Sequence, residues 1–179
     1  GLASRLVGEE MPVSGDLTVT VRVDHSLTAS AYELRVDGGS GSLAAGSVGA
    51  IRHGLTTLAQ LVHHGMPETV RIEDAPRREM RIVMLDLARR WQEPDVVSRL
   101  IDLAAWRKLS HVHLHLTDDE AWRVPSRAHP VLGEIGGVRG HGLPLPPMLG
   151  SGSAPTGRAY TPAEIAAWVA RAHDLGVVL

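Results

Sequence analysis

The chain has 179 residues and a mass of 19.2 kDa, which is room for one ordinary domain or two small ones. Hydrophobic residues make up 44% of it and charged residues 21%, which excludes collagen-like, coiled-coil and disordered classes. The net charge of −2 offers no basic excess, so neither nucleic acid nor a membrane surface is expected as a partner. No apolar run approaches the roughly 20 residues that span a bilayer, and the absence of cysteine excludes a disulfide framework.

The first part of the chain predicts a small α+β layer. Residues 17–23, 31–36 and 70–74 alternate apolar and polar side chains with a period of two, so three strands are expected there. Between residues 42 and 64, apolar side chains instead recur at spacings of three and four, which is typical of one face of an amphipathic helix. Gly65 is expected to end that helix.

The second part repeats a strand-then-helix order. The expected elements are a strand at 80–87, a helix from Pro94, a strand at 111–116, a Gly- and Pro-rich loop at 133–157, a helix from Pro162 and a strand beginning at 176. The run at 80–87 is almost entirely apolar, as in a strand buried on both faces. Thr161 and Glu164 have the spacing of a capping box around Pro162. This order predicts a parallel sheet, either open or part of a closed barrel.

Side chains that could bind or react follow the ends of these strands. They are Asp86 and Arg89 after the first, and Asp118, Asp119, Glu120, Trp122 and Arg123 after the second. Carboxylates and guanidinium groups pair with hydroxyls, and an indole covers C–H surface, so the set suits a polyhydroxylated ligand. A cluster of structural ion pairs that ties loops together is the alternative. Asp119 and Glu120 are not expected to act together as a glycosidase acid pair, because neighbours on an extended strand point to opposite faces.

Three histidines alternate along the second of these strands. Because His111, His113 and His115 are two residues apart, their imidazoles are expected on one face. Two of them could bind a metal ion, with an oxygen ligand from Asp118 or Asp119, which makes a metal-dependent hydrolase a competing hypothesis. The sequence contains no HExxH motif, and structural histidines that fill a barrel interior explain the same pattern.

Several long segments, in the same order along the chain, closely resemble the glycoside hydrolase family 20 β-N-acetylhexosaminidases. In the second part they are the runs 81–89, Lys108-Leu109, 113–123, 129–132, 134–142 and 160–165, and in the first part Tyr32-Glu33-Leu34, 54–61 and 72–77. The resemblance covers essentially the whole chain. It departs from the family pattern at Arg78, Ile82 and Arg90, where an aromatic residue, Gly and His are usual.

The resemblance implies an α/β fold in which a small α+β domain at residues 1–77 precedes the N-terminal part of a (β/α)₈ TIM barrel at 78–179, truncated after about three strands. It also implies release of terminal GlcNAc or GalNAc with retention, in which the substrate's own acetamido oxygen attacks the anomeric carbon. By motif position, Arg89 is expected to bind the sugar hydroxyls, and Asp118 to support the catalytic acid through a histidine from a later strand. No cofactor and no metal is implied, and relatives are often exported or lysosomal, which favours an extracytoplasmic compartment.

The family's catalytic Asp-Glu pair follows the fourth barrel strand, and the present residues reach only the third. Those roles are not transferred to Asp119 and Glu120, which lie in a different motif. We therefore expect this fragment alone to be inactive, and we expect its exposed barrel edge to favour self-association. A noncatalytic carbohydrate-binding or assembly module is a further alternative.

Overall fold

The computed structural model describes residues 17–147 and 152–179. These residues form two compact units. The first contains the described residues up to Met80 together with Trp106–Lys108, and the second contains the described parts of Arg81–Ala105 and Leu109–Leu179. Each unit combines strands and helices, so the predicted α/β class is confirmed. None of the described helices is both long and apolar enough to cross a membrane.

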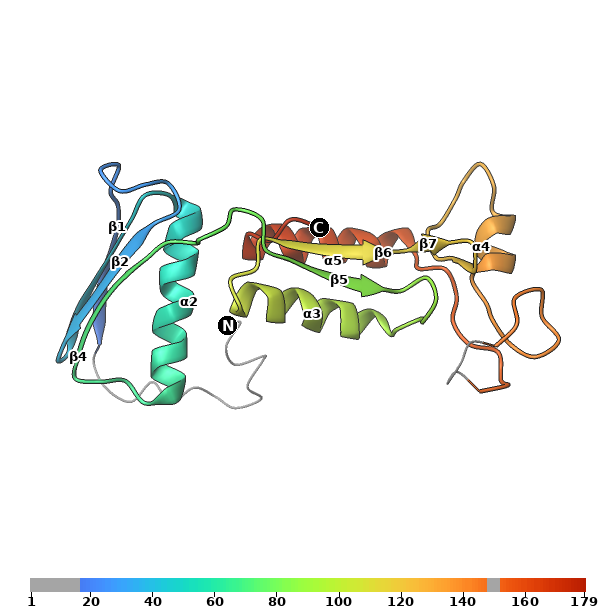
Figure 1. The fold of residues 1–179 in the computed structure, drawn as a ribbon, viewed down its shortest axis with the longest axis horizontal. Coiled ribbons are helices and arrows are strands. Elements are labelled where there is room, and N and C mark those ends of the chain that lie inside the picture. The colour runs from blue at the N-terminus through green and yellow to red at the C-terminus, as the bar shows by residue number, and fades with distance from the viewer. Residues whose placement is uncertain (1–16, 148–151) are drawn as a thin grey trace. The chain divides into compact units, whose positions relative to one another are not determined.

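The first unit is a four-stranded sheet with one helix (Figure 1). In chain order its elements are β1 (Thr18–Val23), β2 (Tyr32–Asp37), β3 (Ser40–Ala45), α2 (Val48–His64) and β4 (Thr69–Asp74). The strand order is β1-β3-β2-β4, with β1 parallel to β3 and the other pairs antiparallel. The three strands predicted in this part of the chain are therefore present, and a fourth separates two of them.

The prediction that the helical pattern starts near residue 42 is wrong, because Ser40–Ala45 forms the strand β3. This segment contains a single large apolar side chain, Leu43, among Ser, Gly and Ala, so its alternation is invisible in the sequence. The helix begins after Ser47, whose hydroxyl accepts a hydrogen bond from Ala50 N. It ends as predicted at Gly65, whose φ of 92° favours glycine.

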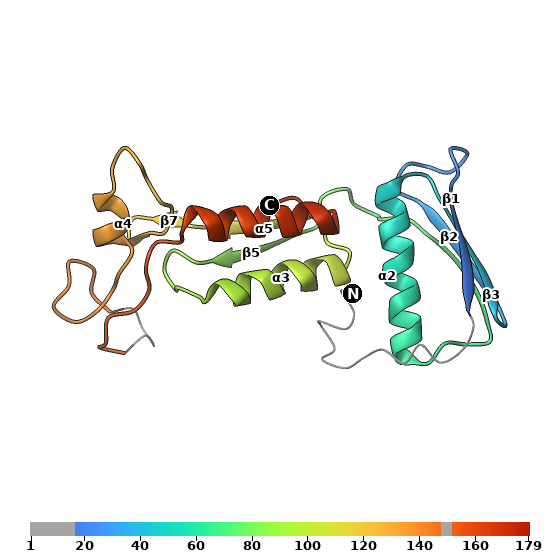
Figure 2. The ribbon, with the colours of Figure 1, turned by 180° about the vertical axis from the view of Figure 1, so that it is seen from behind.

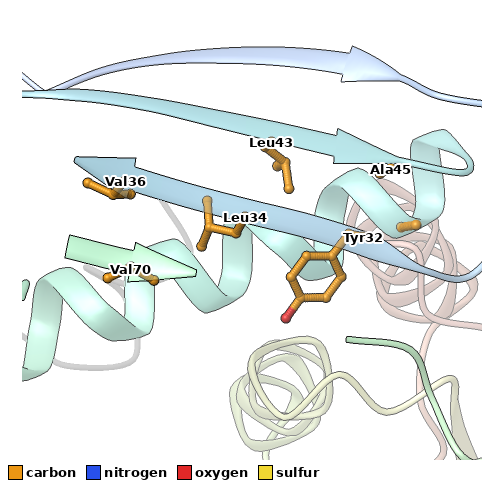
Figure 3. Packing of buried hydrophobic residues seen from close by; sticks show 7 residues of the cluster. Tyr32, Leu34, Val36, Leu43, Ala45 and Val70 are labelled. Carbon is orange, nitrogen blue, oxygen red and sulfur yellow. The ribbon is translucent and has the colours of Figure 1, made fainter. Parts of the chain in front are cut away.

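The core of the first unit lies between the sheet and α2 (Figure 3). Alternate side chains of β2 point into it, so the period of two in the sequence places one face of the strand toward the helix. Its buried members are Tyr32, Leu34, Val36, Leu43, Ala45, Ala50 and Val70. The helix approaches closely at Gly54, where a Cβ atom would lie 2.3 Å from Leu43 Cδ1.

A short segment from later in the chain completes the polar part of the first unit. Lys108 Nζ donates hydrogen bonds to Thr57 Oγ1 at 2.5 Å, to Tyr32 Oη at 2.9 Å and to Asp74 Oδ2 at 3.2 Å. Tyr32 Oη in turn donates to Asp74 Oδ2 at 2.8 Å. Lys108 has a φ of 55°, which is the left-handed conformation. A residue with this conformation often follows the end of a helix and is usually glycine.

The second unit is built on a pair of parallel strands. Its elements are β5 (Ile82–Asp86), α3 (Pro94–Trp106), β6 (His111–His115), β7 (Thr117–Asp118), β8 (Ala121–Trp122), α4 (Val131–Gly136) and α5 (Pro162–Leu175). Strand β6 pairs with β5, and the bridge between His111 and Val178 adds the start of a third parallel strand at its other edge. The two long helices lie side by side (Figures 1 and 2), joined by the ion pair of Arg171 with Asp102 at 2.5 Å.

Two local predictions for this unit have different outcomes. The capping box is present, since Glu164 N donates to Thr161 Oγ1 and Thr161 N donates to the Glu164 carboxylate. The prediction that β5 is buried on both faces is wrong for the described chain, in which Met80, Ile82 and Met84 are 65%, 49% and 53% exposed. The described helices cover only the opposite face of the β5–β6 pair. Val112 of β6 lies on that face and is 2% exposed.

Candidate functional site

The candidate site lies where β5 and β6 end. These strands are parallel and in register, so Asp86 at the end of β5 pairs with His115 at the end of β6. The loop after β5 carries Arg89, and the short strand β7 that follows β6 carries Asp118. Four of the side chains with functional potential are therefore gathered at one edge, as parallel strands require.

Arg89 binds carboxylates from both strands. Its Nε lies 2.6 Å from Asp86 Oδ2 and 3.7 Å from Asp118 Oδ2, and its main-chain N–H donates to Asp86 Oδ1 at 3.0 Å. These partners raise the pKa of Arg89, first through the Asp86 hydrogen bond and charge and then through the charge of Asp118. The side chain is 44% exposed, and neither ion pair uses its Nη groups. A guanidinium held in this way can present its outer N–H groups to a ligand hydroxyl.

Asp118 accepts hydrogen bonds from its neighbours. The bond from Asp119 is the main cause that lowers the pKa of Asp118, followed by the bond with His115, whose Nε2 lies 2.7 Å from Asp118 Oδ2. The pKa of Asp119 is raised for the same reason, because its protonated form donates to the Asp118 carboxylate. Asp118 therefore keeps its negative charge at neutral pH, which suits a carboxylate that orients another group.

The two acidic residues after Asp118 form a turn. Asp119 and Glu120 connect β7 to β8 in a tight hairpin, so the assumption that they continue an extended strand is wrong. The hairpin also places Trp122, whose Nε1 donates to Val124 O at 2.7 Å. Trp122 and Asp118 line one side of a pocket of about 300 Å³, and α4 lines the other.

The expectation that Arg123 faces a ligand is wrong. Its side chain is 1% exposed and donates to the main-chain carbonyls of Leu87, Ala88 and Gly137. The sequence shows only a charged residue next to other polar residues. Burial of this guanidinium depends on carbonyl groups that come from distant parts of the chain, which no local pattern reveals.

The three histidines of β6 have separate surroundings. His111 Nδ1 lies 2.8 Å from Ser110 Oγ, His115 bonds Asp118, and the side chain of His113 is exposed. Within residues 17–147 and 152–179, no three His, Asp or Glu side chains are placed to hold a metal ion. The geometry therefore does not favour the metal-dependent hydrolase hypothesis.

Comparison with known proteins shows which family the chain resembles. Residues 79–179 match the family model of the glycosyl hydrolase family 20 catalytic domain. The chain is 36% identical over 170 residues to a beta-hexosaminidase of Vibrio furnissii, covering 92% of this chain and 28% of that protein. It is 32% identical to an N,N′-diacetylchitobiase of Vibrio harveyi over 78% of this chain and 17% of the relative.

Solved structures give the same result. A family 20 exo β-N-acetylglucosaminidase from Vibrio harveyi, solved in complex with N-acetylglucosamine, superposes with a TM-score of 0.80 at 36% identity, over 89% of this chain and 26% of that one. A family 20 β-N-acetylhexosaminidase from Streptomyces coelicolor superposes with a TM-score of 0.74 at 26% identity, over 98% of this chain and 37% of that one. The present chain thus spans between about a sixth and two fifths of the relatives named here. On these grounds the chain belongs to glycoside hydrolase family 20.

Proposed function

We propose that this chain contributes the sugar-binding part of a β-N-acetylhexosaminidase active site, which acts on glycans that end in N-acetylhexosamine. In this proposal the described residues up to 77 belong to a small domain that precedes the barrel in the sequence, and the described residues from 78 onward supply its first three strands. The observation that carries the proposal is the cluster at the ends of β5 and β6, where a half-exposed Arg89 is held by Asp86 and Asp118. The relatives named as hexosaminidases, and the Vibrio harveyi structure with N-acetylglucosamine, support the substrate class.

In this proposal Arg89 binds ring hydroxyls of the terminal sugar. A guanidinium has N–H groups in a fixed plane and no acceptor, so it recognises the oxygen lone pairs of neighbouring hydroxyls. The Asp86 carboxylate stabilises the charge of Arg89. It accepts one hydrogen bond from Arg89 Nε, which orients the side chain, and one from Arg89 N, which fixes the main chain. Pre-organisation of this kind lowers the entropy that binding must overcome.

Asp118 has a supporting role. The hydrogen bond with His115 helps to hold it as a carboxylate, so it can orient and charge-stabilise an imidazole from another strand. The reaction that the family resemblance implies needs two further groups. One orients the substrate's acetamido oxygen for attack on the anomeric carbon, and the other protonates the departing glycosidic oxygen. Neither group is assigned to a residue of this chain, so we propose that these 179 residues alone do not hydrolyse glycosides.

The exposed apolar face of β5 supports self-association. Ile82 and Met84 are each about half exposed, and an uncovered strand face of this kind favours burial against a second copy. A sedimentation coefficient that rises with protein concentration is the expected observation.

The experiment that tests the function measures sugar binding and turnover separately. Saturation-transfer NMR of the full chain with N-acetylglucosamine is expected to show binding, and Arg89→Ala is expected to abolish it. Arg99→Ala is the matched control, because it removes an exposed arginine from α3, and it is expected to leave binding unchanged. The absence of binding by the parent chain would overturn the proposed sugar site. Release of a chromogenic aglycone from an N-acetylglucosaminide at ordinary enzymatic rates would overturn the claim of inactivity.

A further inference from the structure

Arg123 is a buried cation whose described hydrogen bonds go to main-chain oxygens. Its Nε donates to Leu87 O at 3.2 Å and to Ala88 O at 3.1 Å, and its Nη2 donates to Ala88 O at 3.0 Å. Its Nη1 donates to Gly137 O. Burial lowers the pKa of this guanidinium, and within the described residues no carboxylate lies within ion-pair distance of it.

Burial of a cation with only carbonyl partners costs free energy of folding. A charge taken out of water loses its hydration, and carbonyl dipoles restore less of that energy than a carboxylate would. A buried arginine of this kind is therefore better explained by the geometry it enforces than by a gain in folding free energy. Its partners show which part of the chain that geometry concerns.

Two of the three residues whose carbonyl groups accept from Arg123, Leu87 and Ala88, join Asp86 to Arg89. Leu87 N and Ala88 N both donate to His115 O, at 3.0 and 2.9 Å, while both carbonyls accept from Arg123. All four main-chain polar groups of this dipeptide are thus bound, and both side chains are 0% exposed. The dipeptide has no free polar group through which it could shift or re-pair.

Arg123 also belongs to the segment that carries Asp118. It directly follows β8, and its main-chain N–H donates to Leu116 O at 2.9 Å, which fixes it to the base of the β7–β8 hairpin. The guanidinium therefore connects the hairpin of Asp118 to the loop of Arg89. The Arg89 and Asp118 side chains lie 3.7 Å apart, but Arg89 comes from the loop after β5 and Asp118 from β7, so their separation depends on this connection.

We infer that Arg123 is a positioning residue, which sets where Arg89 lies relative to Asp118 by holding residues 87 and 88 between its guanidinium and the carbonyl of His115. The position of Arg89 matters for sugar binding only through the proposed site, and in that respect the inference rests on the proposed function. The geometric part can be tested without sugar.

The test compares Arg123→Met and Arg123→Lys in the full chain with Arg171→Met. The control removes a partly buried arginine of the same unit, which is 32% exposed and binds Asp102 rather than the loop of Arg89. In Arg123→Met, we expect the Arg89 Nε–H resonance to move and amide exchange at residues 87 and 88 to rise by at least about tenfold. Arg123→Lys, which retains one donor group, is expected to restore part of that protection, whereas Arg171→Met loses stability without either local change.

Sugar binding supplies a second readout. If Arg123 acts through Arg89, Arg123→Met weakens N-acetylglucosamine binding in the parent chain, whereas the control Arg171→Met leaves that binding unchanged. A folded Arg123→Met chain with an unchanged Arg89 resonance and unchanged exchange at residues 87 and 88 would overturn the inference. Failure of the parent chain to bind sugar would instead count against the proposed function, because the resonance and exchange measurements require no ligand.

Discussion

His115 Nε2 lies 2.7 Å from Asp118 Oδ2, although the two residues belong to different strands of the second unit. The same histidine accepts both N–H groups of the dipeptide before Arg89 through its carbonyl oxygen. The ring of His115 therefore bonds Asp118, and its carbonyl oxygen holds the dipeptide that leads to Arg89. The alternation that placed three histidines on one face gave no indication that one of them has this double role.

Replacement of the His115 ring is expected to raise the pKa of Asp118. In His115→Leu the carboxylate loses one of the hydrogen bonds that stabilise its charge, so its pKa moves upward toward that of an ordinary aspartate. His115→Gln places an amide N–H near the position of Nε2 and is expected to restore most of the effect. The measurement is an NMR titration of the Asp118 side-chain carbon. His113→Leu, on the same face of β6, is the control, and an equal pKa change in that variant would contradict the assignment.

Two adjacent threonines of α2 provide a matched test of the polar network in the first unit. Thr57 Oγ1 accepts from Lys108 Nζ and lies 2.6 Å from Tyr32 Oη, whereas Thr56 Oγ1 donates only to Arg52 O of its own helix. Thr57→Val keeps the shape but leaves buried donors without this partner, so we expect a loss of about 1 to 3 kcal/mol in the free energy of unfolding. Thr56→Val is expected to change it by less than about 0.5 kcal/mol. Urea unfolding of both variants checks the difference, and equal losses would be the contrary result.

Glu164 is expected to make the second unit sensitive to acid. The Arg158 hydrogen bonds are the main cause that lowers its pKa from 4.5 to about 2, and the cap on α5 also contributes. Because the folded-state pKa lies below the unfolded one, this contribution to stability is complete above about pH 4.5 and is lost as the pH falls toward 2. Since Arg158 is 43% exposed, the ion pair is worth less than about 1 kcal/mol.

The check is a series of unfolding curves from about pH 6 down to about pH 2 for the parent chain and Glu164→Gln. The stability difference between them is expected to be largest at the high end and to vanish at the low end. Glu68→Gln, an exposed carboxylate of the first unit, serves as control. A difference that stays constant across the series would show that the carboxylate charge has no such effect.

The elements that could be predicted are those whose signals are local. Thr161, Pro162 and Glu164 lie within four residues, and the capping box that they form is present as expected. The strand β3 was missed because its stability comes from pairing with β1 and β2 on either side, and its own side chains are mostly small. Pairing between segments contributes to stability without leaving a periodic pattern in the sequence.

The candidate site shows the same division. The register of two parallel strands was enough to bring Asp86, Arg89 and Asp118 to one edge. The burial of Arg123 was not predictable, because its carbonyl partner at Ala88 lies 35 residues away and main-chain oxygens are the same for every residue type. The hairpin at Asp119 was also missed, since Asp and Glu fit a turn as well as an exposed strand end.

Lys108 has one more consequence, for the order in which the chain can fold. Its ammonium bonds oxygen atoms of Tyr32, Thr57 and Asp74, so the first unit is discontinuous in sequence. A shortened polypeptide that stopped at residue 80 would include the four strands and the helix of this unit but would leave those three oxygens without their cation. During synthesis, this layer can acquire its final polar contact only after α3 has been made, which ties the maturation of the earlier segment to the emergence of the later one.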